Sequence, residues 1–520
     1  MITRRLFLGS SAAGAAALFG APREGAQPSP ELEKLGAAAL GEAKRLKASY
    51  ADLRINRYRE QAVDFTLLPG AGGEVNGVPG VSNRDSFGCG VRVIADGAWG
   101  FSASPQVTLE EIVRITREAV ALARANAALK GRPLALAPVQ AYHARWSSRF
   151  ERNPFDVPLD EKLALLEAAA RTARDKAGIL SANASLFFRS EDKYFASSEG
   201  SSIQQLILQT GGGLRASAVD SAKGLSKSRN YSIEPLSAGW EYAHALPWQE
   251  SARRIREEVL EHLAAPPVQA GRKDLVLLPS HLYLTIHESI GHSTELDRAL
   301  GYEANFAGTS FLTPDKKGRE RIASEIVTVY GDRTNEGGLA TVGYDDDGVR
   351  AVRFPIVERG LFQHYQTTRE MAPLTGERES NGCAYAESWA AVPFQRMPNV
   401  WLAPGKAETT LDDLIAGVDD GVLIEGAGSY SIDHQRYNFQ FGGDAFWEIK
   451  GGRKRGMLSS VAYQSRTTDF WRSCDGIAGQ RFWRQFGTPS DGKGEPVQIN
   501  GCSHGCAPAR FRQIPVIQTD

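Results

Sequence analysis

The chain has 520 residues, of which 42% are hydrophobic, and carries 60 lysines and arginines against 61 aspartates and glutamates. This length and composition allow two or three domains with sizeable cores, and five cysteines are too few for a disulfide scaffold. The net charge of -1 gives no overall field that would favour an anionic membrane or nucleic acid, so no nucleic-acid partner is expected.

The N-terminus has the features of an export signal. Arg4 and Arg5 precede Leu-Phe-Leu and an uncharged run rich in alanine and glycine, residues 9–22, which is too short and too weakly apolar to span a bilayer. The pattern predicts a twin-arginine signal over residues 1–26, cleaved between Ala21 and Ala26, and a periplasmic or otherwise exported protein. A chance Arg-Arg pair is the alternative. No later segment is long and apolar enough to predict a transmembrane helix.

The first unit, residues 31–131, is predicted to be an α/β domain. Helical spacing of leucines and alanines predicts helices over 31–49 and 109–129. Strands are predicted at 52–58 and 62–68, a mobile Gly/Pro/Asn-rich loop at 69–83, and a β-hairpin turn at Asp96-Gly97.

A second α/β domain, residues 139–269, is predicted after a proline-containing linker. A helix over 159–176 precedes strands at 182–189, 193–198 and 202–210, with Glu199-Gly200 as a turn. Residues 217–234 carry little pattern and are expected to form a surface loop or lid.

The third unit, residues 270–520, is predicted to be a mostly antiparallel β domain, because short strands and glycine turns dominate it. The whole chain is therefore expected to be α+β: N-terminal α/β units followed by a β-rich C-terminal domain that carries one distorted helix.

That helix contains the chain's most informative motif, His287-Glu-Ser-Ile-Gly-His292. In the H-E-x-x-H zinc motif, histidines four residues apart share a helix face, with the glutamate as general base. Here the step is five residues, which in a regular α-helix turns the second ring roughly 140° away from the first. Either a π-bulge or loosening at Gly291 could bring both rings to one ion.

Two histidines on a helix are also often one buried, hydrogen-bonded residue and one at the surface. The preceding segment favours the metal interpretation, because a predicted buried strand over 274–279 and an apolar run over 283–286 lead directly into His287. A buried Glu288 beside two imidazoles needs a nearby cation, and a metal ion would supply it.

Several further motifs resemble the TldD/PmbA metallopeptidases, long described as modulators of DNA gyrase, and in particular the TldD side of that family. They follow the HExxxH motif along the chain: Glu295-Leu-Asp297, Gly343-Tyr-Asp-Asp-Asp-Gly348, Arg396-Met-Pro-Asn399 and Cys502-Ser-His-Gly-Cys-Ala-Pro-Ala-Arg-Phe511. The resemblance implies a peptidase with one Zn²⁺ per chain that acts on unfolded peptides. It also implies a TldE/PmbA-type paralogous partner that lacks the metal motif.

The third metal ligand is where this sequence departs from the family. In members with a Cys-Gly-Lys segment, that cysteine is the third zinc ligand, whereas this chain has Asp491-Gly-Lys. A His/His/carboxylate set is an ordinary catalytic zinc site, so His287, His292 and Asp491 are the predicted ligands. Cys502 and Cys506, with His504 between them, are the competing candidates, and the two cysteines could instead form a disulfide or simply be buried.

The remaining assignments follow from this ligand set. Glu288 is the predicted general base, Glu295 is expected to orient an imidazole rather than bind the metal, and His281 is expected in a strand or loop. A non-catalytic peptide-binding or partner subunit is the alternative function. Modulation of gyrase is disfavoured, because gyrase is cytoplasmic whereas the chain carries an export signal.

Overall fold

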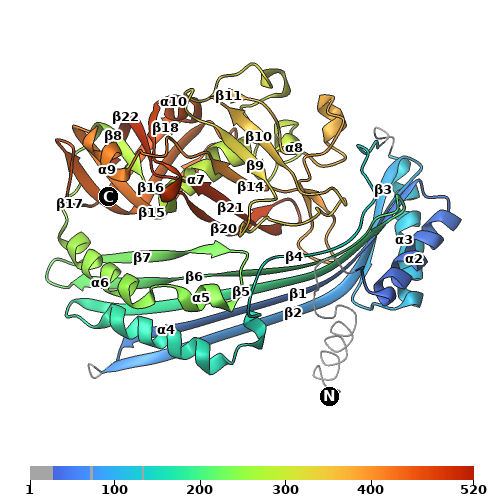
Figure 1. Cartoon of the computed structure of the whole chain (residues 1–520), viewed down its shortest axis with the longest axis horizontal. Coiled ribbons are helices and arrows are strands. Elements are labelled where there is room, and N and C mark those ends of the chain that lie inside the picture. Colours follow the sequence, from blue (N-terminus) through green and yellow to red (C-terminus); the bar gives the residue numbers. More distant parts are fainter. Residues whose placement is uncertain (1–26, 71–73, 130, 132–133, 520) are drawn as a thin grey trace.

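A long, curved seven-stranded sheet runs along one side of the molecule in the computed structural model (Figure 1). The structure describes residues 27–70, 74–129, 131 and 134–519, and the predicted signal at 1–26 lies outside them. The strand order is β3-β2-β1-β5-β6-β4. Strand β4 pairs with the first part of β6, and β7 pairs with the later part of β6. The strands are β1 (Tyr50–Pro69), β2 (Val75–Ala95), β3 (Ala98–Ser104), β4 (His143–Ser147), β5 (Ile179–Ser197), β6 (Ser202–Asp220) and β7 (Leu225–Leu236).

Both predicted N-terminal units contribute strands to this one sheet, because β1 of the first pairs along most of its length with β5 of the second. The predicted turns at Asp96-Gly97 and Glu199-Gly200 are confirmed, with Asp96, Gly97 and Gly200 all at positive φ. The domain boundaries themselves stay predictions.

Two predicted loops are wrong. Residues 75–83, within the predicted mobile loop, belong to β2, and residues 217–234 belong to the end of β6 and to β7. Among the described residues, β2 up to residue 88 pairs with no strand other than β1, and this position at the edge of the sheet tolerates Pro79 and the neighbouring glycines.

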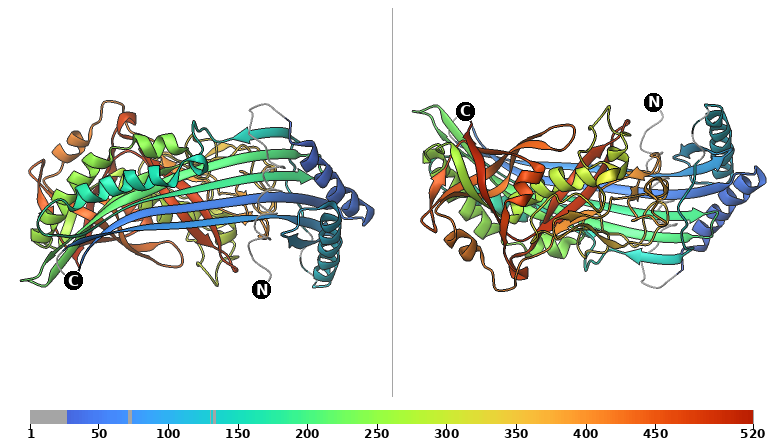
Figure 2. Two further views of the ribbon diagram at one scale, coloured as in Figure 1. Left: turned by 90° about the horizontal axis from the view of Figure 1, so that it is seen from below. Right: turned by 90° about the horizontal axis from the view of Figure 1, so that it is seen from above.

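Five helices cover one face of the sheet, as Figures 1 and 2 show. They are α2 (Pro30–Arg45), α3 (Leu109–Ala127), α4 (Leu159–Arg174), α5 (Trp240–Ala245) and α6 (Trp248–Ala264). The Ser29 and Thr108 side chains accept backbone N–H groups at the starts of α2 and α3. Side chains alternate between faces along a strand, and in β1 Leu53 and Ile55 pack under α2 and α3, while Val63 and Phe65 pack with α4.

The C-terminal part lies on the opposite face of the sheet (Figure 2). Its largest sheet closes on itself through β15-β8-β22-β18-β16, because β15 also pairs with β16. Only the β15–β8 pairing in that sheet is parallel among the described residues, so the predicted mostly antiparallel α+β architecture is confirmed. Its strands are β8 (Gly271–Leu277), β15 (Asp420–Ile432), β16 (Asn438–Lys450), β17 (Arg453–Leu458), β18 (Val461–Arg466), β19 (Cys474–Ile477) and β22 (Ala509–Gln518).

Helix α7 (Pro279–Ile286) packs between β15 and the two-stranded β20–β21 ribbon. The remaining strands are β9 (Val329–Asp332), β10 (Arg353–Glu358), β11 (Leu361–Phe362), β12 (Ala384–Tyr385), β13 (Phe394–Gln395), β14 (Asn399–Leu402), β20 (Arg484–Lys493) and β21 (Gln498–Cys506). The short helices are α8 (Leu296–Ala299), α9 (Leu411–Ala416) and α10 (Thr467–Arg472). In the described residues no helix combines the length and apolar character needed to cross a membrane.

Candidate metal centre

The end of α7 has the distortion that the five-residue histidine spacing requires. The helix continues as a π-turn over His287–Gly291, and the backbone N–H of His292 donates to the carbonyl of His287 five residues earlier. This bond places the two residues one π-turn apart, with ring centroids 4.5 Å from each other. Of the two predicted ways to bring the rings together, the structure has the π-bulge.

Contacts of Ser289 and Gly291 with neighbouring side chains hold the π-turn in place. Ser289 Oγ donates to the carbonyl of Thr285 and accepts a 2.9 Å hydrogen bond from the indole of Trp471. A Cβ atom on Gly291 would lie 2.6 Å from the sulfur of Met397, so a larger residue would need Met397 to move.

Asp491 lies opposite the two imidazoles. Its Oδ1 is 3.6 Å from Nε2 of both His287 and His292. Thr488 pairs with Cys502 and Asp491 pairs with Asn500, so one extra residue is inserted in β20. This bulge brings Asp491 onto the same face of the ribbon as Cys502.

Charges around Asp491 keep it ionised. Its Oδ2 accepts a 3.1 Å hydrogen bond from Nη2 of Arg396, which is fully buried. Burial alone would raise the pKa of Asp491, but the imidazoles of His292 and His287, together with Arg396, outweigh it and hold that pKa well below its ordinary value. The site thus holds one buried anionic oxygen beside two imidazole nitrogens.

A buried polar cluster supports His292. The Nδ1 atom of His292 lies 2.8 Å from Glu295 Oε2, as expected for a carboxylate that orients an imidazole. Arg298 donates to the same oxygen, and Lys493 donates to the other oxygen of Glu295 and to Asp297. Burial lowers the pKa of His292 to about 4, so the ring is neutral at pH 7 and its Nε2 can act as a ligand.

Glu288 points to a different partner. Its Oε2 accepts a 2.5 Å hydrogen bond from Nη1 of Arg436, in the turn between β15 and β16. Arg436 has φ of 62° and also donates to the carbonyl of Ala307. Sequence reasoning missed Arg436, because a lone arginine in a polar turn gives no signal of its long-range partner.

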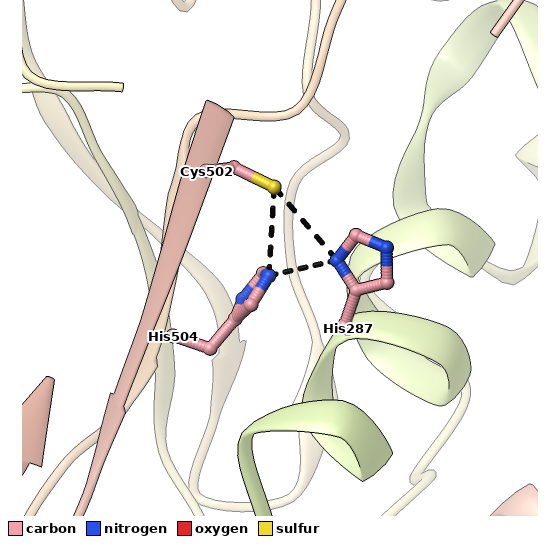
Figure 3. Close-up of side chains that lie close together, drawn as sticks. All are labelled: His287, Cys502 and His504. Carbon is pink, nitrogen blue, oxygen red and sulfur yellow. Dashed lines mark hydrogen bonds between the residues drawn. The ribbon is translucent and has the colours of Figure 1, made fainter. Parts of the chain in front are cut away.

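Two of the competing candidates, Cys502 and His504, lie beside His287 (Figure 3). Cys502 Sγ is 3.8 Å from His287 Nδ1 and 3.6 Å from Nε2 of His504, whereas Cys506 faces the carbonyl of Pro279. Cys502 and Cys506 form no disulfide, and burial raises the pKa of both thiols. His281, expected in a strand or loop, lies instead in α7, where it contacts Tyr463.

Three family models match consecutive parts of the chain. They describe PmbA/TldA metallopeptidase domain 1, over residues 51–123, the central domain, over 152–263, and the C-terminal domain, over 270–499. The chain belongs to the PmbA/TldD family. This confirms the resemblance seen in its motifs.

Curated relatives support the same assignment. A metalloprotease of Methanocaldococcus jannaschii is 26% identical over 462 residues, which cover 88% of this chain and 95% of the relative. A zinc metalloprotease TldD homolog of Saccharolobus solfataricus is 22% identical over 481 residues, covering 89% and 96%. The fold matches that of TldE from Thermococcus kodakarensis with a TM-score of 0.70 at 16% identity, covering 94% of this chain and 99% of that one.

These relatives are named metalloproteases, which implies that they use a metal ion. The donor atoms of this chain's site fit such an ion. The Nε2 atoms of His287 and His292 and a carboxylate oxygen of Asp491 belong to a buried group whose ligand atoms lie within 4.8 Å of one another. Two imidazoles and one carboxylate are donors that zinc accepts, and three protein ligands leave a position for water or substrate.

Proposed function

We propose that the chain is a zinc-dependent peptidase that hydrolyses unfolded or extended peptides. One Zn²⁺ per chain would be held by His287, His292 and Asp491. The observation that carries the proposal is the common approach of both Nε2 atoms to one oxygen of Asp491.

The chemistry divides between the ion and the protein. Zinc held by these ligands supplies a Lewis acid for the scissile carbonyl and lowers the pKa of a bound water. Glu288 would accept the proton of the attacking water and pass it to the leaving amine. Arg436 donates a hydrogen bond to the Glu288 carboxylate and so fixes its orientation.

Two further proposals concern the setting of this activity. Family membership and the fold shared with TldE support a paralogous TldE/PmbA-type partner subunit. The Arg4-Arg5 pair supports export to the periplasm by the twin-arginine route. Replacing both arginines with lysine should leave the protein in the cytoplasm, and unchanged export would contradict that route.

The experiment that tests the function is the Glu288→Gln substitution in the zinc-loaded mature chain, assayed with and without the partner. We expect it to keep stoichiometric zinc and to lose at least about 100-fold in hydrolysis of a quenched, unstructured peptide, because general acid–base catalysis contributes that much. Glu377→Gln, a carboxylate that pairs with Lys317, is the control and should remain active.

The outcomes separate the candidate functions. Zinc lost in Glu288→Gln would mean that Glu288 is a ligand rather than the base. A wild-type chain that binds the unstructured peptide without cleaving it, with partner present, would favour the non-catalytic peptide-binding subunit.

A further inference from the structure

A second imidazole contacts the ring of His287 at the nitrogen that does not face Asp491 (Figure 3). His287 Nδ1 lies 2.8 Å from Nε2 of His504, and His504 Nδ1 lies 3.0 Å from the carbonyl oxygen of Val400. His504 and Val400 are fully buried and His287 is nearly so. These contacts form an unbroken line from a backbone carbonyl to the candidate metal centre.

The chemistry of each atom in this line fixes where the hydrogens lie. A carbonyl oxygen only accepts, so His504 must carry its hydrogen on Nδ1. The Nε2 of a neutral His504 then has a lone pair and accepts from His287 Nδ1–H. Neutral His287 is left with its lone pair on Nε2, which is the atom 3.6 Å from Asp491 Oδ1.

We propose that His504 is a positioning residue that fixes the tautomer of His287 and so presents its Nε2 to the metal. The proposal rests on the metal site of the proposed function. The two candidate imidazole ligands would then be oriented differently, since His292 donates to the carboxylate of Glu295 whereas His287 donates to a neutral ring.

The same geometry disfavours a second metal between His287, Cys502 and His504. Such an ion would need lone pairs on both facing nitrogens. At zinc–nitrogen distances of about 2.0 Å, two tetrahedral ligands would be separated by roughly 3.3 Å. The 2.8 Å between the two ring nitrogens is instead a hydrogen-bond distance.

Metal affinity tests the proposal without relying on activity. Zn²⁺ affinity of the full-length mature protein would be measured by chelator competition for His504→Ala and His504→Gln. We expect about a 10- to 100-fold loss for His504→Ala, the effect typical of removing a partner of a ligating histidine. His504→Gln should recover most of it, because its amide oxygen can accept near the position of Nε2.

The matched control is His281→Ala, since His281 is equally buried and hydrogen-bonded but contacts Gly426 and Tyr463 rather than a candidate ligand. It should retain wild-type affinity within about twofold. Unchanged affinity in His504→Ala, or equal losses in His504→Ala, His504→Gln and His281→Ala, would overturn the proposal.

Two measurements on the unmutated protein keep the proposal testable if the variants fail to fold. Side-chain ¹⁵N NMR of the zinc-loaded, histidine-labelled protein should show His287 with its hydrogen on Nδ1, and a hydrogen on Nε2 would overturn the assignment. Titration with Co²⁺ should give one equivalent without a thiolate charge-transfer band. A second equivalent that disappears in Cys502→Ala would overturn the proposal in favour of a second metal.

His292→Ala separates this inference from the proposed function. Loss of zinc in His292→Ala, together with retention in His504→Ala, would remove only the positioning role. Retention of zinc in His292→Ala would remove the metal centre and the positioning role with it.

Discussion

Asp491 is the residue on which the candidate centre depends most, because one of its oxygens approaches both histidine Nε2 atoms equally. Asp491→Ala should therefore lower Zn²⁺ affinity strongly. Asp491→Cys should restore a tight site with a changed metal preference, since a thiolate is softer than a carboxylate. Metal content after dialysis, and competition between Zn²⁺ and Co²⁺, would measure both effects.

The control variants for Asp491 are Cys502→Ala and Cys506→Ala. Both thiols are buried. Cys502 contacts His287 and Cys506 contacts the carbonyl of Pro279, so neither thiol is hydrogen-bonded to Asp491 among the described residues. Metal content should be unchanged in both. Zinc that is lost with either cysteine but kept without Asp491 would move the third ligand downstream into β21.

His262 in α6 makes stability depend on pH. It is buried against Phe446, neither ring nitrogen has a hydrogen-bond partner among the described residues, and burial lowers its pKa from 6.5 to about 4. Between these values the unfolded chain binds a proton that the folded chain does not, so stability falls as pH drops below about 6.5.

His262→Leu should remove this loss of stability at acid pH. The free energy of unfolding of the variant, relative to that of the wild type, should rise by about 2 kcal/mol between pH 7.5 and pH 4.5, allowing for partial screening. Urea unfolding at both pH values would measure it, with the exposed His143→Asn as control. An advantage that does not change with pH would show that His262 does not titrate in this way.

Among the residues of the site, those that lie close together in the sequence could be predicted from it. His287, Glu288 and His292 are recognisable because they share six residues, and Glu295 because it follows within one turn. Asp491 came from the family resemblance rather than from any local pattern. Arg436 and Arg396 could not be assigned, because only tertiary packing brings them to Glu288 and Asp491.

At the scale of elements, the π-turn shows how a local irregularity creates the site. There is little room for a side chain at Gly291, where a Cβ would lie 2.6 Å from the sulfur and 2.8 Å from the methyl carbon of Met397, so Met397 would have to move. Gly291→Ala should cost about 1 to 3 kcal/mol of unfolding free energy, the usual range for overpacking, and should weaken metal binding.

Met397 provides the matching test of that clash. Gly291→Ala combined with Met397→Ala should be more stable than the sum of the two single changes, because the added methyl would fill part of the space that Met397 leaves. Urea unfolding of the four proteins completes the cycle. Additive effects would mean that the Gly291 position tolerates a side chain by another movement.

The long strands explain which elements the sequence misplaced. Strand β1 was predicted as two strands, 52–58 and 62–68, with Arg59, Glu60 and Gln61 left between them. These residues lie between the segment covered by α2 and α3 and the segment covered by α4, where the helix face of the sheet is only half-buried. The backbone continues as a strand because β2 and β5 bond it on both sides.

At the scale of the whole molecule, the sheet meets the C-terminal part through charged and polar groups. Arg92 of β2 bonds Asp347, Arg54 of β1 donates to the carbonyl of Ala391, and the hydroxyls of Tyr58 and Tyr385 lie 2.6 Å apart. This explains why the Asp-rich motif at 345–347 could be seen in the sequence but not placed. Its partners lie on strands more than 100 residues earlier.

The central contact of this interface is the ion pair of Lys193 on β5 with Asp346, at 3.0 Å and almost fully buried. Lys193→Met should cost about 3 to 5 kcal/mol of unfolding free energy, because it leaves Asp346 and the neighbouring Glu191 buried without their cation. Replacing Asp346 with Asn as well should recover part of that loss.

The chain also offers an exposed ion pair between the same two parts, Arg149 with Glu336 at 2.7 Å, with side chains 84% and 68% exposed. Arg149→Met should change stability by less than about 1 kcal/mol, since water already solvates both charges. Urea unfolding followed by tryptophan fluorescence and by circular dichroism would compare the variants. Equal effects of Lys193→Met and Arg149→Met would show that burial of the first pair contributes nothing to holding the C-terminal part on the sheet. A large loss confined to Lys193→Met, with two separate transitions, would show that this pair couples the unfolding of the two parts.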